Sequence, residues 1–347
     1  MAESVLNRAV AKSPDRTVER PVRMLLVRGS PLLVERLRAV APRGEFIVVG
    51  DAAAGEPYLD DVEAVYMADR LRPSYLCAPR LRWLHIAGAG VDGFSIAGLR
   101  DAPFVITHKV RGSVIPMAEH VMAQILLIAR RALEYRALQA ERRWARASEW
   151  PTSELIQIHG KTLGLVGLGH AGLAIARRAK PFGMRVVGVK RTTVDRLPHV
   201  DAVYPSDRLG EMLAQVDFVA VTAPLTDQTY HLIGEAELRA MKPTAYLINN
   251  SRGPIIDEEA LIRALQEGRL AGASLDVFEH EPLDPASPLW DMPNVIVTPH
   301  CGGVGPNLAE DTAQEIATNL RRFVAGRPLL YQLNRADIVT RFNPPSH

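Results

Sequence analysis

Three short segments in the second half of the chain carry side chains that together could bind an acid and exchange a proton with it. They read NNSRG, FEHEP and TPHCGG, and they contain Arg252, Glu281 and His300. A guanidinium binds a carboxylate through two parallel hydrogen bonds, and an imidazole gains or loses a proton near neutral pH. A neighbouring carboxylate orients that imidazole and favours its protonated form. These residue types and their order predict a catalytic trio.

Each member of the trio also has a less specific interpretation. Arg252 would hold a substrate carboxylate and polarise the adjacent carbonyl, or it would pair with a surface acid such as Asp257 or Glu258. His300 would act as general acid and base, or it would be a hydrogen-bonded structural histidine. The run Glu279–Glu281 is also compatible with metal binding, but three adjacent loop residues rarely face one ion, so we expect no metal.

A glycine-rich segment upstream predicts a dinucleotide site. The sequence GLGHAG follows the apolar strand-like stretch Thr162–Val166 and precedes the helix-like stretch Leu173–Lys180. In this context the first glycine permits a tight turn, the second lets backbone approach a pyrophosphate, and the third lets the helix pack on the strand. The N–H groups at the start of the helix would then face the phosphates. The alternative is a structural glycine turn. We expect cofactor contacts from Gly167, Gly169, His170, Ala171 and Gly172.

The end of the next strand bears on which nicotinamide cofactor is bound. An NAD site carries an acid about 20 residues after the glycines, where it accepts hydrogen bonds from a ribose hydroxyl. Here the chain reads GVKRTT, with Lys190, Arg191 and Thr192 at that place. Two cations and the hydroxyls of the two threonines suit the additional phosphate of NADP. We therefore expect NADP, with NAD possible, and the alternative is a solvated basic turn with dual specificity.

The elements that must position these residues alternate along the chain. Short, almost continuously apolar stretches are separated by more polar, helix-compatible ones, a pattern typical of parallel sheets covered on both faces. A long helix is expected over Pro116–Arg143, with proline at its first position, and another over Asn307–Val324. The expected strands are 23–27, 46–49 and 64–67 in a first series, and 163–166, 186–189, 218–221, 246–248 and 295–297 in a second.

Composition places the chain among ordinary globular proteins. Its 347 residues are enough for two domains, with 47% hydrophobic and 23% charged residues. The formal net charge of +2 gives no reason to expect nucleic acid or a membrane surface as partner. The first 20 residues lack the apolar core of a signal peptide, and no stretch approaches about 18 uninterrupted apolar residues. With only two cysteines, no disulfide framework is expected, and we predict a cytoplasmic protein.

Seven motifs in order, from about Arg82 to Gly303, resemble the D-isomer-specific 2-hydroxyacid dehydrogenase family. They are LHIAGAGVDGF, PMAEHVM, TLGLVGLGHAG, APLTDQT, INNSRG, LDVFEHEP and TPHCGG. The resemblance implies an α/β fold of two Rossmann-like, doubly wound parallel-sheet domains, the first discontinuous. It also implies a homodimer built on the long helix, whose alternative is a helix buried inside one subunit. The implied division is a flexible tail at 1–20, a flavodoxin-like substrate domain at 21–112 plus 307–347, and a dinucleotide-binding Rossmann domain at 113–306.

The resemblance also implies roles for single residues. Ala89 and Gly90 would bind the substrate carboxylate through the backbone, with an ordinary strand-to-helix turn as the alternative. Asp276 would contact the nicotinamide carboxamide, with a solvated strand-end acid as the alternative, and Pro224 would line the cofactor site.

The implied activity is that of an NADP-preferring 2-oxoacid reductase acting on a short acid of the glyoxylate or hydroxypyruvate type to yield a D-2-hydroxy acid. Relatives that oxidise formate carry glutamine beside the histidine, and relatives that oxidise phosphite carry lysine at the position of Ala89, so both reactions are disfavoured. A different class of relative, the C-terminal-binding-protein corepressors, senses NAD(H) and binds transcriptional partners. The side chains that choose among oxo acids are not identified by the sequence.

Overall fold

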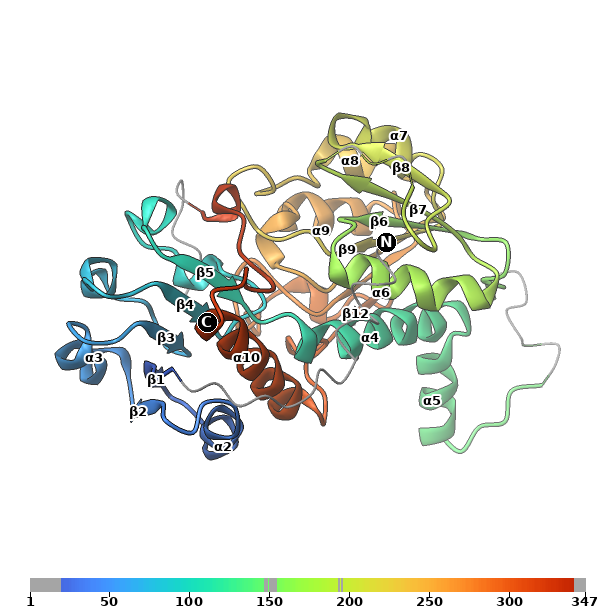
Figure 1. Cartoon of the computed structure of the whole chain (residues 1–347). Coiled ribbons are helices and arrows are strands. Elements are labelled where there is room, and N and C mark those ends of the chain that lie inside the picture. The colour runs from blue at the N-terminus through green and yellow to red at the C-terminus, as the bar shows by residue number, and fades with distance from the viewer. Residues whose placement is uncertain (1–19, 147–148, 150–154, 193, 195, 340–347) are drawn as a thin grey trace.

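The computed structural model describes residues 20–146, 149, 155–192, 194 and 196–339. Two parallel sheets form the centres of two α/β domains (Figure 1). The expected α/β class with two doubly wound domains is therefore confirmed. The expected N-terminal tail lies outside the described residues except for Arg20, and so do residues 340–347 of the substrate domain.

The first sheet contains five strands in the order β2-β1-β3-β4-β5, and every pair is parallel. This order is the flavodoxin-like one, in which the strand order reverses between β1 and β3. Ser30 accepts a hydrogen bond from the Leu33 N–H and so begins the helix after β1. The elements are β1 (Arg23–Val27), α2 (Pro31–Val40), β2 (Glu45–Val49), α3 (Ala52–Gly55), β3 (Ala64–Met67), β4 (Trp83–Ile86) and β5 (Val105–His108).

The second sheet contains seven parallel strands in the order β12-β11-β10-β9-β6-β7-β8. The order reverses between β6 and β9, and the glycine-rich segment follows β6 at this switch point. The strands are β6 (Thr162–Val166), β7 (Arg185–Lys190), β8 (Ala202–Pro205), β9 (Phe218–Val221), β10 (Tyr246–Asn249), β11 (Gly272–Leu275) and β12 (Val295–Val297). The helices are α6 (His170–Ala179), α7 (Leu209–Leu213), α8 (Glu235–Ala240) and α9 (Glu258–Gln266).

All of the expected strands are present, and the structure adds β4, β5, β8 and β11, which were not among the strand ranges given for the two expected series. Two of the missed strands bury polar side chains against each other. The Thr107 hydroxyl of β5 accepts from the indole of Trp83 at 2.8 Å and contacts Nδ1 of His85 at 2.9 Å. Buried polar groups are tolerated when they are paired, but the pairing partner cannot be seen from a single segment. These strands therefore lack the continuous apolar pattern of their neighbours.

The expectation of one helix over Pro116–Arg143 is wrong. The structure has α4 (Arg111–Ala129) and a separate α5 (Ala132–Ala140), with Arg131 between them at φ +49° and ψ +39°. A residue in this left-handed conformation ends the helical hydrogen-bond ladder and turns the chain. Pro116 lies inside α4 and not at its first position. Arginine is a good helix former, so the local sequence carries no signal for the break.

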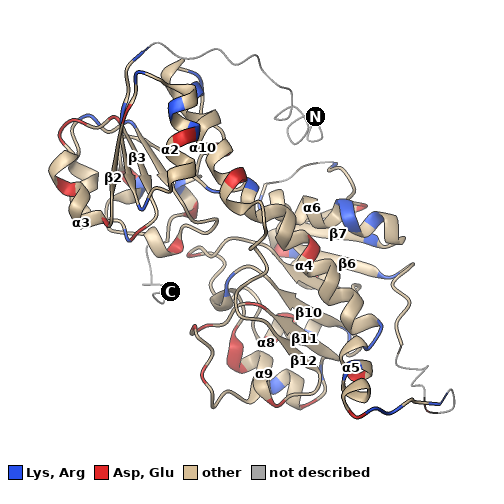
Figure 2. Cartoon of the chain, turned by 90° about the horizontal axis from the view of Figure 1, so that it is seen from below, with Lys and Arg blue, Asp and Glu red and all other residues tan. Residues whose placement is uncertain are grey.

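Helix α10 (Leu308–Val324) returns the chain to the first domain, which is discontinuous as expected. Its most extensive packing is against α2, and it also contacts α4. In Figure 2, α4 and α10 lie between the two domains. After α10 the chain pairs with β5, where Thr107 and Gln332 form an antiparallel bridge. We propose the domain boundaries at residues 112/113 and 306/307, beside the starts of these two crossing helices.

Among the described residues, α4 alone has the length and composition of a membrane-spanning helix, with a mean hydropathy of 1.4 over 18 residues. No such helix is expected from the sequence, because Glu119, His120 and Gln124 interrupt its apolar residues. Half of that stretch is buried inside the protein, where Ala118, Val121 and Ile125 pack in one cluster with residues of β6 and α6. This burial is typical of a core helix in a globular domain.

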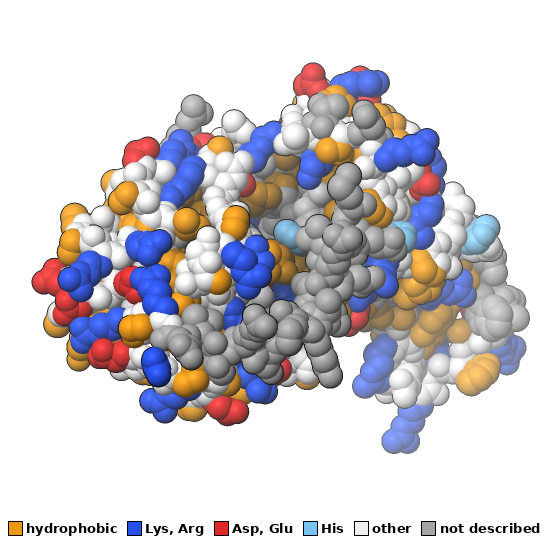
Figure 3. Space-filling model, in the orientation of Figure 1, with side chains coloured by type: hydrophobic (Ala, Val, Ile, Leu, Met, Phe, Trp, Pro, Cys, Tyr) orange, Lys and Arg blue, Asp and Glu red, His pale blue; other side chains and the backbone are white. Residues whose placement is uncertain are grey.

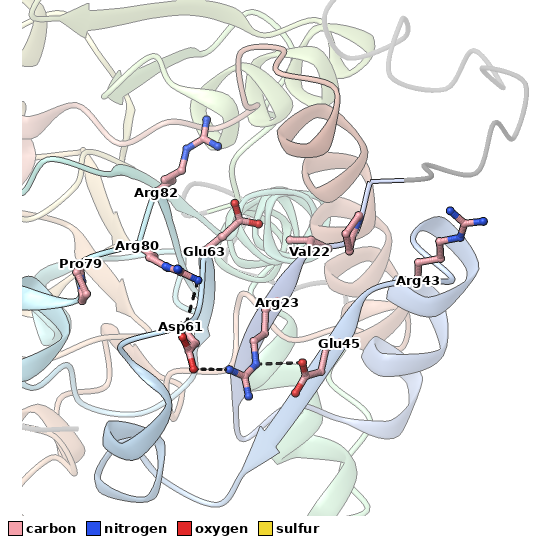
Figure 4. Close-up of a pocket in the computed structure, with 10 residues that line it drawn as sticks. Val22, Arg23, Arg43, Glu45, Asp61, Glu63, Pro79, Arg80 and Arg82 are labelled. Carbon is pink, nitrogen blue, oxygen red and sulfur yellow. Dashed lines mark hydrogen bonds and ion pairs between the residues drawn. The ribbon is translucent and has the colours of Figure 1, made fainter.

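A shallow hollow of about 670 Å³ lies at the amino ends of the first-domain strands (Figure 4). Some of its charged side chains pair with one another, since Arg23 lies 3.0 Å from Glu45 and 2.8 Å from Asp61. Ligands of open parallel sheets bind at the opposite, carboxyl ends of the strands. The hollow is therefore not the candidate site described below.

Candidate active site

The expected trio follows three adjacent strands at the same edge of the second sheet. The parallel register aligns Asn249 of β10 with Leu275 of β11, and Leu275 with Val297 of β12. Arg252, Glu281 and His300 follow these strand ends in the sequence. The loops also touch, because a Cβ added to Gly302 would lie 2.0 Å from the Asn250 side-chain nitrogen. The structure thus brings the loop of Arg252 against the loop of His300.

His300 and Glu281 form a close pair. Nδ1 of His300 lies 2.6 Å from a carboxylate oxygen of Glu281, whose other oxygen accepts the Phe278 N–H at 3.1 Å. The Glu281 side chain is 14% exposed and that of His300 is 38% exposed, so the acid lies deeper than the imidazole. His300 has φ +52°, a left-handed conformation uncommon for a side-chain-bearing residue. Its N–H donates to the Asp276 carbonyl at 2.8 Å, which holds this conformation.

Asp276 organises the loop that carries His300. It is 2% exposed, so the solvated alternative does not apply. Its carboxylate accepts from the Thr298 hydroxyl at 2.6 Å, and it accepts the N–H groups of Cys301 at 2.9 Å and Gly302 at 2.8 Å. His120 of α4, which was not an expected site residue, lies 4.0 Å away. A contact with nicotinamide stays a prediction for Asp276.

Arg252 reaches across to the first domain. Its Nε donates to both carboxylate oxygens of Asp92, at 3.1 and 3.2 Å, and Asp92 is buried. A Cβ added to Gly90 would lie only 1.9 Å from a terminal nitrogen of Arg252. Arg252 therefore does not pair with Asp257 or Glu258, and it packs on the glycine that was expected to meet the substrate carboxylate. Asp92 was not expected, although it lies in the same motif as Gly90.

The strand-end loop of the first domain adds positive charge near this contact. Lys109 follows β5, and its N–H donates to the carbonyls of Ile86 and Gly88. Burial lowers the pKa of Lys109, Glu315 opposes that effect, and the nearby Arg252 lowers the pKa further. Ala89 is exposed, and its carbonyl contacts Nδ1 of His108 at 3.0 Å. Two cations close enough to affect each other suit an anionic ligand.

The glycine-rich segment has the geometry that a pyrophosphate needs. Gly167 has φ +107°, and a Cβ there would lie 2.7 Å from the Ala223 nitrogen, next to Pro224. A Cβ on Gly172 would lie 2.2 Å from the Gly167 carbonyl oxygen, so the third position also requires glycine. Gly169 is exposed with no atom within 4 Å of such a Cβ. Open backbone before the N-terminus of α6 is a suitable cradle for a dinucleotide.

The basic end of β7 is engaged with other parts of the protein. The Lys190 ammonium donates to the Leu168 carbonyl at 3.2 Å, within the glycine-rich loop. Arg191 pairs with Asp337 at 2.7 Å, and Thr192 is exposed beside it. Asp337 belongs to the C-terminal part of the first domain and was not expected near the cofactor site. His170 at the start of α6 faces Tyr331 from the same C-terminal segment, with ring centroids 5.5 Å apart.

The acidic run next to the trio is divided between two histidines. Glu279 lies 2.6 Å from Nε2 of His231, whereas Glu281 contacts His300. Within the described part of the chain, no three histidine, cysteine, aspartate or glutamate side chains come together as a metal site. The geometry therefore favours two acid–imidazole pairs over a metal cluster at residues 279–281.

Comparison with known proteins identifies relatives for most of the chain. Residues 122–302 match the family model described as "D-isomer specific 2-hydroxyacid dehydrogenase, NAD binding domain". The chain is 37% identical to a glyoxylate reductase of Korarchaeum cryptofilum over 254 residues, which cover 72% of this chain and 75% of the relative. It is 39% identical to glyoxylate/hydroxypyruvate reductase B of Erwinia tasmaniensis, with 72% and 78% covered.

A solved structure extends the similarity to both domains. It is the NADPH-dependent glyoxylate/hydroxypyruvate reductase SmGhrB of Sinorhizobium meliloti, determined with NADP and malonate. The TM-score is 0.73 and the identity 30%, and the match covers 92% of this chain and 99% of the other.

Proposed function

The chain belongs to the D-isomer-specific 2-hydroxyacid dehydrogenase family, and on that basis we propose that it reduces a short 2-oxo acid with NADPH. The product would be the D-2-hydroxy acid, and glyoxylate and hydroxypyruvate are the substrates named for its relatives. The observation that carries the proposal is the meeting of the His300–Glu281 pair with the loop of Arg252, which itself packs on Gly90 of the first domain.

The proposed mechanism assigns a separate task to each group. Arg252 and the backbone around Ala89 and Gly90 bind the substrate carboxylate, which fixes the neighbouring carbonyl between the domains. Nδ1 of His300 is held by Glu281, so Nε2 exchanges the proton with the carbonyl oxygen. The reduced nicotinamide, when bound, supplies a hydride to the carbonyl carbon. The carbonyl thus gains one hydride and one proton and becomes the alcohol.

Several residues support the preference for NADP. Gly169 and the start of α6 leave backbone open to the pyrophosphate, while Lys190, Arg191 and Thr192 offer cations and a hydroxyl where a ribose phosphate would lie. The residues of β7 itself include no acid, and its last residue is Lys190. The matched Sinorhizobium reductase is described as NADPH-dependent. We therefore propose NADP as the main cofactor, with NAD as a weaker one.

The activity is tested with purified full-length protein and a panel of 2-oxo acids of increasing size, assayed with NADPH and with NADH. We expect turnover on the shortest acids and a higher kcat/KM with NADPH. A strong preference for NADH would overturn the NADP assignment. Negligible turnover on every oxo acid, together with capture of transcriptional regulators, would favour the corepressor-like alternative.

The proton-transfer role is tested by His300→Asn, which we expect to lower kcat by about 100- to 10,000-fold. Glu281→Gln keeps the size of the acid and removes its charge, so we expect a smaller loss of kcat than in His300→Asn. Near-normal turnover in His300→Asn would end the assignment.

We also propose that the protein is a homodimer that uses α4 and α5. Judged on the described residues, no residue of α5 is fully buried, and its large side chains Leu133 and Tyr135 are 50% and 38% exposed. Ile115 of α4 is exposed as well. Figure 3 shows basic and acidic side chains interspersed over one face, with hydrophobic ones exposed among them near α5. We propose no nucleic-acid or membrane partner and a cytoplasmic location.

A further inference from the structure

The C-terminal part of the first domain lies along the proposed cofactor site. We call residues 329–339 the C-terminal strap; it follows α10 and runs beside β5 (Figure 1). The Leu333 N–H donates to the Ile106 carbonyl at 2.9 Å, and the His108 N–H donates to the Tyr331 carbonyl at 3.2 Å. The strap thus pairs with β5 around the antiparallel bridge between Thr107 and Gln332, and it reaches from there to the second domain.

Strong local contacts hold the strap in place. Arg335 donates to the carbonyls of Leu99 and Ala102, both at 3.0 Å. Ile338 is buried in the first-domain core, and the Asn334 side chain accepts the Ala336 N–H at 3.1 Å. The short 3-10 helix Arg335–Asp337 is therefore anchored on both sides. A carboxylate in this helix has a defined position before any ligand binds.

Asp337 is presented by this helix to the basic end of β7. Its carboxylate lies 2.7 Å from a terminal nitrogen of Arg191, and the two side chains are 18% and 48% exposed. Lys190 is directed to the glycine-rich loop, where it donates to the Leu168 carbonyl. Of the two cations expected at the ribose phosphate, Arg191 is thus bound to an acid of the other domain.

We propose that Asp337 restrains Arg191 and thereby sets how strongly the protein prefers the phosphorylated cofactor. This inference rests on the proposed function, because it concerns the same cofactor site. A 2′-phosphate must take Arg191 from Asp337 to form its own ion pair, whereas a ribose that carries only hydroxyls makes no such demand. The acid therefore weakens NADPH binding and leaves NADH binding almost unchanged.

The experiment measures dissociation constants for NADPH and NADH by nucleotide fluorescence, without an oxo acid present. In Asp337→Asn we expect NADPH to bind about threefold to fivefold more tightly, and we expect the dissociation constant for NADH to change by less than about twofold. This change equals roughly 0.7–1 kcal/mol, which is the range for partly exposed ion pairs. In an Arg191→Gln background, Asp337→Asn should no longer strengthen NADPH binding.

The matched control is Asp227→Asn, because Arg100 and Asp227 form another ion pair between the domains, at 3.4 Å, and the same Arg100 nitrogen donates to the Ile338 carbonyl of the C-terminal strap. If either substitution merely loosened the contact between the domains, the dissociation constants for NADPH and NADH would change by similar factors. The proposal is overturned if Asp337→Asn leaves the dissociation constant for NADPH unchanged or changes the constants for NADPH and NADH by the same factor. It is also overturned if Asp337→Asn strengthens NADPH binding equally in the Arg191→Gln background. These binding results stay interpretable even if no oxo acid is turned over.

Discussion

At the scale of single residues, the site depends on side chains that meet from distant parts of the chain. The Arg252–Asp92 ion pair joins two motifs 160 residues apart, and both partners are largely buried. A buried carboxylate next to a guanidinium keeps that cation in one orientation, which limits the ordering needed when a substrate binds. Asp92 thereby acts as a positioning residue for Arg252 in the proposed reaction.

The contact between Gly90 and Arg252 yields a sharp test. In Gly90→Ala the new methyl group would lie 1.9 Å from the Arg252 guanidinium and 2.6 Å from the Asp92 carboxylate and would separate this pair; both are the far ends of side chains and not backbone, so the fold should tolerate it. We expect the KM for the oxo acid to rise roughly ten- to hundredfold, as expected for the loss of a charge-assisted contact, with little change in Tm. Steady-state kinetics and thermal unfolding measure both quantities.

Gly93→Ala is the matched control in the same loop, because no atom lies within 4 Å of its added Cβ. We expect wild-type KM values in that variant. Equal effects of the two substitutions would show that loop flexibility, and not the approach of Arg252, explains the result.

At the scale of elements, the glycines around β6 and α6 divide into two kinds. Gly172 packs its helix against the strand that precedes it, whereas Gly169 borders open space. We expect Gly169→Ala to keep the wild-type Tm and to weaken cofactor binding at least tenfold, because the methyl group would occupy the place of the pyrophosphate. Gly172→Ala should lower the Tm, because its methyl group meets backbone.

Isothermal calorimetry with NADPH and thermal unfolding of both variants provide the measurement. Wild-type NADPH affinity in Gly169→Ala would remove the glycine-rich loop from the proposed cofactor site.

The junction of the crossing helices contains a buried acid with a shifted pKa. Glu315 of α10 is 1% exposed and accepts the N–H of Arg111 at 2.8 Å and that of Val110 at 3.2 Å, at the start of α4. Burial raises the pKa of Glu315 from its ordinary 4.5 to about 7, and the two N–H groups oppose this rise. The carboxyl thus binds its proton more tightly in the folded protein than in the unfolded chain.

The pH dependence of stability follows from this difference. The contribution of Glu315 is fully present below pH 4.5 and is lost as the pH rises to about 7, because ionisation is then favoured in the unfolded chain. We expect the free energy of unfolding of the wild type, relative to Glu315→Gln, to fall by roughly 3 kcal/mol across this range. Urea unfolding of both proteins at several pH values measures it, and parallel curves would contradict it.

At the scale of the whole molecule, the exposure of α5 is not explained by packing within one described chain. A helix without a buried face is stabilised in proteins by a partner or by its own charges. Leu133 and Tyr135 give it an apolar surface that a second copy would cover. The proposed homodimer would therefore account for a helix that has no fully buried residue in the described part of its own subunit.

We expect Leu133→Glu to convert the dimer to a monomer, which light scattering after size exclusion would detect against the chain mass of 38.1 kDa. Val48→Glu introduces the same charge at an equally exposed position on β2 and should leave the dimer intact. An unchanged mass for Leu133→Glu would place the interface elsewhere or exclude the dimer.

The sequence by itself determined the features that depend on neighbouring residues. Apolar runs predicted the strands that are buried on both faces, and the glycine spacing predicted the turn between β6 and α6, because these patterns are local requirements of backbone geometry. The order of the motifs indicated the family, and the resemblance to that family implied the two-domain fold. It also placed Arg252, Glu281 and His300 at strand ends, since the carboxyl ends of parallel strands share one edge of a sheet.

Only the tertiary structure decided which groups from distant segments meet. The pairing of Asp92 with Arg252 and of Asp337 with Arg191 depends on how the two domains face each other, which no local pattern encodes. The left-handed conformation of Arg131, between α4 and α5, could not be predicted from the sequence either, because arginine favours helices and rarely adopts that conformation. Long-range contacts are chosen by the packing of the whole chain, so charge partners can be identified only once the fold is known.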